Sequence, residues 1–159
     1  MAEEIQVSLP NDALSQADWI DAYQVKLPIG SSFATARQAA EAIVAAFPKW
    51  TYFLLMIRQI VLAPFGLKGP KHIENMNVES VGFFPIIGET ENKLIAGFDD
   101  KHLDFRLVID LESSLASQTV TLSTVIRRHN WIGRTYLALI LPFHRLIIKL
   151  SLSRAAASR

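Results

Sequence analysis

The fold class of this chain is decided by one stretch, Lys101-His-Leu-Asp-Phe-Arg-Leu-Val-Ile-Asp-Leu111. Every second residue in it is apolar: Leu103, Phe105, Leu107, Ile109 and Leu111. The alternate positions carry His102, Asp104, Arg106 and Asp110. A period of two is typical of a strand in an antiparallel sheet that has one dry face and one wet face. We therefore predict that the charged set forms a solvated outer face with cross-strand ion pairs.

Further strands and three helices are predicted around this stretch. A strand over residues 21–28 is followed by a helix over 33–47, capped by Ser31 or Ser32, and by a second helix over 49–62. The other strands are expected at 81–87, 93–98, 102–111 and 118–129, with a short one near 73–76 and a last helix over 131–152. This order predicts an α+β fold, in which a curved antiparallel sheet wraps around a long C-terminal helix and two helices follow the first strand.

The C-terminal helix has an apolar side that we predict to face the sheet. Its members are Tyr136, Leu139, Ile140, Phe143, Ile147 and Leu150, and the opposite side carries Arg134, Ala138, Arg145 and Lys149. Pro142 lacks an amide hydrogen, so a kink is expected there. An apolar cavity between this helix and the sheet is the natural place for a ligand.

Composition limits the class of protein. The 159 residues predict a single domain over residues 18–152, with loosely held tails at 1–17 and 153–159. The net charge of +1 gives no basic footprint for nucleic acid, and the absence of cysteine excludes disulfides and thiolate chemistry. The acidic start, Met1-Ala-Glu-Glu, is unlike a signal peptide, so a cytoplasmic location is expected. Charged residues and Pro142 interrupt the two most apolar stretches, 50–65 and 135–148, so no transmembrane segment is predicted.

Four stretches resemble a known superfamily. They are Gly82-Phe-Phe-Pro-Ile-Ile87, Ala96-Gly-Phe-Asp-Asp-Lys-His-Leu-Asp-Phe-Arg106, Val125-Ile-Arg-Arg-His-Asn-Trp-Ile-Gly-Arg-Thr-Tyr136 and Leu141-Pro-Phe-His-Arg145. With the element order, they resemble the helix-grip fold of the START and birch-pollen-allergen superfamily (SRPBCC), and within it an uncharacterised bacterial family. The resemblance implies a cavity that in relatives holds lipids, polyketides or other apolar molecules. It implies no catalytic residue and no cofactor.

Two polar residues are the sharpest candidates for a site in such a cavity. His144 flanks the apolar side of the last helix, and Thr124 lies on the strand face that carries Val120, Leu122 and Ile126. Each is either a ligand anchor or a core residue with a local hydrogen bond. The expected ligand-binding set is Phe98, Phe105, Leu107, Leu122, Thr124, Ile126, Tyr136, Ile140 and His144.

Two charged groups have competing interpretations. His102 and Asp104 are either an acid–base pair or part of the solvated face, and they are too few for a metal site. Arg127, Arg128, His129 and Arg134 either meet an acidic headgroup at the cavity mouth or form structural ion pairs, with Asp99 or Asp100 as a partner for Arg134.

Three functions remain open at this stage. The first is binding of a small hydrophobic or amphipathic, lipid-like molecule. The second is an enzyme of the cyclase or hydratase kind that acts on a polyketide-like substrate, with His144 or the His102–Asp104 pair as its base. The third is a non-catalytic interaction domain that forms a homodimer, because Leu55 and Leu62 lie beside Arg58 and Gln59 on an apolar helix.

Overall fold

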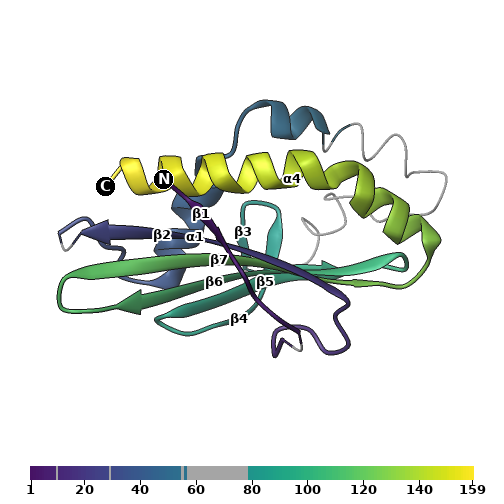
Figure 1. Ribbon diagram of the computed structural model, residues 1–159, viewed down its shortest axis with the longest axis horizontal. Helices are drawn as coiled ribbons and strands as arrows, with labels where there is room; N and C mark the ends of the chain where they lie inside the picture. Colours follow the sequence, from purple (N-terminus) through teal and green to yellow (C-terminus); the bar gives the residue numbers. More distant parts are fainter. Residues whose placement is uncertain (10, 29, 55, 57–78) are drawn as a thin grey trace.

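One antiparallel sheet and one long helix dominate the computed structural model, which describes residues 1–9, 11–28, 30–54, 56 and 79–159 (Figure 1). The strands are β1 (Glu3–Ile5), β2 (Trp19–Pro28), β3 (Ser80–Val81), β4 (Phe84–Glu89), β5 (Lys93–Asp99), β6 (Leu103–Ser113) and β7 (Ser117–Arg128). Their order in the sheet is β1-β2-β7-β6-β5-β4-β3, and every described pair is antiparallel. The predicted α+β, helix-grip type of architecture is confirmed.

The alternation in residues 103–111 places its apolar members against the helices, as predicted. Leu107 lies opposite Thr124 and Ile109 opposite Leu122 in the register of β6 and β7. Leu107 and Ile109 are 3% and 0% exposed, and both belong to the main core cluster. The inner face of the sheet and the two helices that cover it therefore enclose this core.

Helix α1 (Ala36–Ala45) begins later than predicted. Its cap is Thr35, whose Oγ1 accepts a hydrogen bond from the Gln38 amide at 3.2 Å, and not Ser31 or Ser32. Residues 50–54 and 56 are also helical, consistent with the start of the second predicted helix. The rest of that helix and the strand near 73–76 lie outside the described residues.

Helix α4 (Trp131–Ala157) runs along the inner side of the sheet, and its axis bends in its N-terminal half (Figure 1). Its buried residues are Gly133, Leu137, Ile148, Ser151, Leu152 and Ala155. The predicted inner face is therefore wrong in part, because Leu139 is 71% exposed and Phe143 is 46% exposed. Residues 136–143 are almost entirely apolar, so hydropathy alone does not choose a face within this segment.

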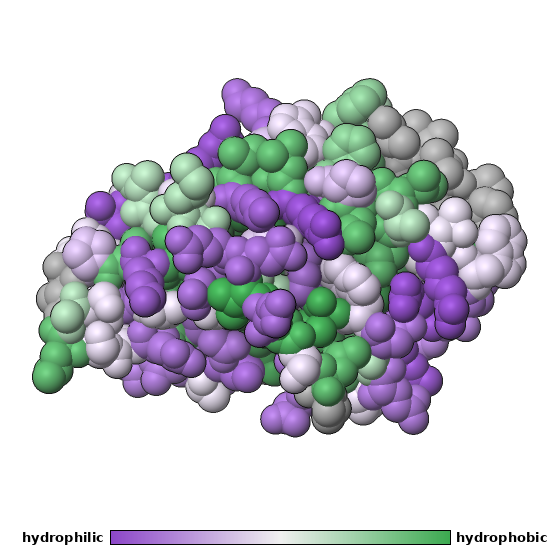
Figure 2. Space-filling model, in the orientation of Figure 1, coloured by the Kyte–Doolittle hydropathy of each residue, from purple (hydrophilic) through white to green (hydrophobic). Residues whose placement is uncertain are grey.

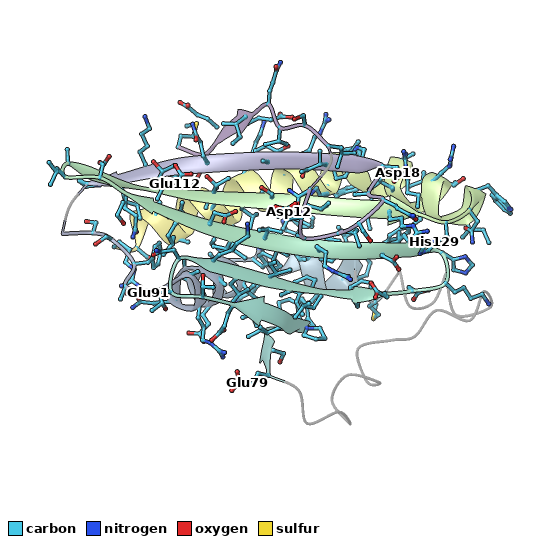
Figure 3. The ribbon with its side chains drawn as sticks, turned by 90° about the horizontal axis from the view of Figure 1, so that it is seen from below. Asp12, Asp18, Glu79, Glu91, Glu112 and His129 are labelled. Carbon is cyan, nitrogen blue, oxygen red and sulfur yellow. The ribbon has the colours of Figure 1, made fainter. Side chains whose placement is uncertain are left out.

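The opposite face of the sheet is not fully solvated, which corrects a second prediction. His102, Asp104 and Arg106 are only 5%, 9% and 9% exposed. Leu14 packs on Val108 and Val125, and the segment that carries Asp12 crosses this face of the sheet (Figure 3). Val108 is the one apolar residue in the charged alternation, and Leu14 of this segment packs against it.

The terminal segments are part of the fold. Residues 1–17 were predicted to be a loose tail, but β1 pairs with β2, and the Ala2 amide donates to Ser153 Oγ at 2.9 Å. Residues 153–159 were predicted to fray, yet α4 continues to Ala157 and Ala155 is 2% exposed. The two ends of the chain lie next to each other (Figure 1), so each stabilises the other.

Candidate functional site

A polar cluster lies between α4 and the inner face of the sheet. Asp21 on β2 and Thr124 on β7 are directly opposite in the strand register. His144 of α4 reaches both: its Nε2 lies 3.1 Å from Thr124 Oγ1 and 3.4 Å from Asp21 Oδ1. Three elements distant in sequence therefore bring an imidazole, a hydroxyl and a carboxylate to one point.

The period of each element explains this meeting. Strand β2 alternates, so Asp21 shares the inner face with Tyr23 and Val25. On α4, His144 lies seven residues after Leu137 and four before Ile148, and both of these are buried. Such spacing follows one side of a helix. The sequence therefore places two polar residues, Asp21 and His144, on faces whose other members are largely apolar and buried.

The cluster is largely shielded from water. Thr124 is 1% exposed, Tyr23 is 0% exposed, and the Asp21 side chain is 6% exposed. The His144 side chain retains 17% exposure, and the Trp19 ring meets it edge-on with 6.1 Å between centroids. Solvent therefore reaches the cluster past His144 and Trp19 rather than through the sheet.

Two buried oxygens of the cluster lack a hydrogen-bond partner among the described residues: Asp21 Oδ2 and the hydroxyl of Tyr23. Burial, the negative charges of Asp21 and Glu4, and an interaction of the hydroxyl with the Asp21 side chain that falls short of full hydrogen-bond geometry raise the pKa of Tyr23 to about 12, against the opposing effect of Arg145. The phenol is therefore neutral near pH 7 and can donate a hydrogen bond. An unpaired buried oxygen is costly, so both atoms favour a polar partner.

The contacts of His144 define its chemistry. Asp21 and Thr124 both approach Nε2, so a proton on that nitrogen can be donated to either of them. In that tautomer Nδ1 is the nitrogen left to accept a proton. The arrangement can hold a ligand group by hydrogen bonds, and it can also orient an imidazole as a base.

The structure separates the predicted ligand-binding residues into four pairs and a single residue, Ile140. Thr124 and His144 are in contact, as described above. Leu107 and Leu122 are in the main core cluster, whereas Ile126 and Tyr136 pack with Leu103 and Leu137 in a second one. Phe98 stacks on Phe105 with 5.5 Å between ring centroids. Ile140 is partly buried on α4.

The ring of Phe105 belongs to a longer aromatic row. Phe84 stacks on Phe105 at 5.6 Å, Phe83 meets Phe84 at 5.5 Å, and Tyr52 meets Phe83 at 5.8 Å, all measured between ring centroids. The row joins β5, β6 and β4 to the helical residues 50–54. The row runs from the edge of the core cluster, against which Phe84 and Phe105 pack, to the exposed ring of Tyr52.

Two of the four residues in the cationic group at the end of the sheet, Arg128 and His129, form structural ion pairs. Arg128 pairs with Asp18 at 3.1 Å, and His129 pairs with Asp104 at 3.0 Å; Asp18 and His129 are at the same end of the sheet in Figure 3. His102 Nδ1 lies within hydrogen-bond distance of the Asn130 side chain, which caps α4. Arg106 forms an ion pair with Asp99 at 2.7 Å. Arg134, for which Asp99 or Asp100 was the predicted partner, forms no ion pair within the described part of the chain.

Sequence reasoning found half of the polar cluster and missed Asp21 and Tyr23. The signal was present in the alternation Trp19, Asp21, Tyr23, Val25, Leu27, which puts one carboxylate on an otherwise apolar face. A strand predicted over residues 21–28 does not by itself show that its first side chain meets the C-terminal helix. Among the described residues, no group of three His, Asp or Glu side chains could hold a metal ion.

The comparisons with known proteins give a family and no function. A family model described as "Protein of unknown function (DUF2867)" matches residues 13–151. No curated protein matches the chain. No solved structure matches it either.

Proposed function

We propose a function for this site from the premise that the chain belongs to the DUF2867 family, whose matched region, residues 13–151, contains Asp21, Tyr23, Thr124 and His144. The proposal is that the protein binds a small, largely apolar molecule between α4 and the sheet. A hydrogen-bonding head on that molecule would meet the polar cluster. The observation that carries the proposal is the pair of unpartnered buried oxygens, Asp21 Oδ2 and the Tyr23 hydroxyl.

These two oxygens also favour one class of head group. Asp21 accepts hydrogen bonds and, when ionised, repels an anion, whereas the neutral Tyr23 phenol donates. A ligand hydroxyl can donate to Asp21 and accept from Tyr23 at the same time. Each unpaired buried group costs about 1–3 kcal/mol. Pairing both would therefore favour an alcohol over a carboxylate of the same chain length.

The surroundings of the cluster support an apolar body for the ligand. Tyr23, Leu122 and Ile148 belong to the main core cluster that surrounds it. Ligand sites are typically apolar walls with a few convergent polar groups. The likeness to the SRPBCC superfamily adds support, since the helix-grip arrangement carries such sites in that superfamily; membership is itself part of the proposal.

Decanol and decanoate are the probes that test the proposal. The Trp50→Phe, Trp131→Phe protein leaves Trp19, which touches His144, as the only tryptophan, so its emission reports ligand at the cluster. We expect decanol to bind at least about tenfold more tightly than decanoate. Asp21→Asn should weaken decanol binding by about tenfold and abolish the discrimination against decanoate.

Ser151→Ala is the matched control. Ser151 is 0% exposed on the same side of α4, but its hydroxyl is satisfied by the Ile147 carbonyl at 2.7 Å. This variant should bind decanol as the parent does. Failure of both probes to bind, or equal binding of decanol by the parent and Asp21→Asn, would overturn the proposal.

The contact between Asp21 and His144 favours a second candidate, an enzyme of the cyclase or hydratase kind. A carboxylate against one ring nitrogen fixes the tautomer and orientation of an imidazole, as a positioned base requires. If a compound co-purifies with the protein, the same material separates the two candidates. Conversion of that compound by the parent, lost in His144→Gln, supports catalysis; its unchanged mass in both supports binding alone.

A further inference from the structure

The charges of this chain are distributed unevenly along its length. None of its 15 Asp and Glu residues lies beyond Glu112, whereas seven of its 16 Lys and Arg residues do. Four of these seven, Arg134, Arg145, Lys149 and Arg154, are on α4. The near-neutral total therefore conceals a helix that carries only positive charge.

The solvent side of α4 is apolar as well as cationic. Leu139, Phe143 and Leu146 are 71%, 46% and 49% exposed. They follow one another at spacings of four and three, which places them on one strip of the helix. We call these three residues the apolar strip. Arg145 and Lys149, both exposed and four residues apart, border the strip on the side away from residues 50–56.

Aromatic residues extend the apolar strip on its other side. Trp50 meets the Phe143 ring with 6.5 Å between centroids. Trp50, Tyr52, Phe53 and Met56 are themselves 37% to 57% exposed. Figure 2 shows apolar side chains gathered over α4 and its neighbouring helical residues, with hydrophilic groups beside them. A monomer in water does not usually leave such a surface uncovered.

We propose that this side of α4 docks on the surface of a bilayer that contains anionic lipid. The helix would lie parallel to the membrane, with the apolar strip at the acyl boundary and Arg145 and Lys149 at the headgroups. A helix with Lys and Arg on one edge and Leu, Phe and Trp on the other binds interfaces in this way. Each cation near an anionic surface strengthens binding by about fivefold.

The charges argue for a lipid surface over a second copy of this chain. A symmetric dimer through the apolar strip would bring the cationic border of one copy to that of the other. Within the described residues the one acid paired with this border is Glu4, 3.7 Å from Lys149, while Arg145 forms no ion pair. An anionic bilayer supplies the counter-charge that this surface lacks.

The apolar strip lies on the far side of α4 from the buried residues that face the polar cluster. Its cationic border is nearer to the cluster, since Lys149 Nζ lies 5.4 Å from the centre of the Tyr23 ring and Arg145 lowers the pKa of Tyr23. The variants of Leu139 and Leu146 therefore test docking independently of the proposed ligand site. By length and composition α4 is also apolar enough to span a membrane, as are the core helices of many soluble proteins. In the structure its other side packs on the sheet, through Leu137 and Ile148. Surface binding keeps that packing intact, whereas spanning would remove it.

Co-sedimentation of the full chain with vesicles tests the proposal. Binding to phosphatidylcholine vesicles should rise sharply when phosphatidylglycerol is included, and high salt should release the protein. Leu139→Ser with Leu146→Ser should weaken binding at least about tenfold. The control is Leu115→Ser, a leucine 100% exposed in the β6–β7 hairpin, which should bind normally.

A second set of variants tests the contribution of the cationic border to vesicle binding and leaves the apolar strip unchanged. Arg145→Gln and Lys149→Gln should each weaken binding to the anionic vesicles by about fivefold, whereas Lys26→Gln, exposed on β2, should not. Asp21→Asn should bind vesicles as the parent does, so failure here is distinguishable from failure of the ligand site.

Three results would overturn the proposal. One is equal binding to vesicles with and without phosphatidylglycerol, or no binding at all. Another is vesicle-bound protein that withstands high salt and alkaline washing, because α4 would then be inserted. The third is a concentration-dependent dimer in sedimentation velocity that Leu139→Ser with Leu146→Ser dissociates, because the surface would then face a second copy.

Discussion

Asp21 determines the character of the interface between α4 and the sheet. Its neighbours on the same strand face, Tyr23 and Val25, are buried with it, and its partner across the strands is Thr124. One oxygen of its carboxylate contacts His144, and the other has no partner within the described chain. A leucine at this position would simply enlarge the core. The carboxylate instead places a hydrogen-bonding group in that core.

The stability of the protein at alkaline pH tests whether the Tyr23 phenol is held in its neutral form by the fold. Its pKa rises from 10.0 in the unfolded chain to about 12 in the fold. A raised folded pKa gives stability that is fully present below pH 10 and is lost as the pH rises through about 12. The contribution is on the order of 3 kcal/mol. Urea unfolding between these two pH values measures the loss.

Tyr23→Phe should remove that share of the alkaline loss, because the variant has no phenol to ionise. Near pH 7 it should be as stable as the parent or up to about 1 kcal/mol more stable, since the deleted hydroxyl has no partner. Tyr52→Phe, at a residue 56% exposed, is the control and should keep the parent's pH profile. Identical alkaline profiles for the parent and Tyr23→Phe would contradict this account of the cluster.

The strands were predictable because their alternation is regular. Strand β5 ends one residue later than the predicted strand at 93–98, and β7 is shifted by one residue at both ends from the one predicted at 118–129. The four consecutive strands β4 to β7 are neighbours in the sheet. The orientation of α4 was harder to predict, because residues 136–143 are almost uniformly apolar. Gly133 is the informative residue there: a Cβ at that position would collide with the His102 carbonyl, which identifies the side of α4 that touches β6.

The outer face of the sheet shows what a single strand pattern cannot reveal. Charged residues alternate along β6, yet Asp104 and Arg106 are largely buried, and another part of the chain packs on Val108 of the same strand. That cover begins at Leu14, in a segment too short and too polar to predict as structure. Periodicity reports which face is apolar, and it does not report what a distant segment does to the other face.

Leu14→Ala tests whether this cover stabilises the sheet. Leu14 is 7% exposed and packs against Val108 and Val125, so its truncation should lower the free energy of unfolding by about 2–3 kcal/mol. Chemical denaturation measures the change. Leu115→Ala, at a fully exposed leucine, should alter it by less than about 0.5 kcal/mol. Equal effects of the two substitutions would mean that residues 11–17 do not hold the outer face.

The N-terminal strand and the end of the C-terminal helix contact each other. Strand β1 extends the sheet beside β2, and from there Glu4 reaches Lys149 at 3.7 Å while the Ala2 amide reaches Ser153 at 2.9 Å. The last turns of α4 are thus attached both to the core, through Leu152 and Ala155, and to the N-terminal strand. The first turns of α4 are attached elsewhere, at Asn130 and His102.

Removal of residues 1–9 should therefore loosen one end of α4 and leave the other intact. We expect amide hydrogen exchange to accelerate by at least about tenfold in residues 151–155, with little change in residues 133–140. Lys149→Gln, which removes the ion pair with Glu4 and the cation–π contact with Tyr23 but leaves β1 in place, is the matched control and should produce a much smaller change. Uniform acceleration along the helix would show that β1 supports the entire fold, and unchanged exchange would show that the terminal contacts contribute nothing to α4.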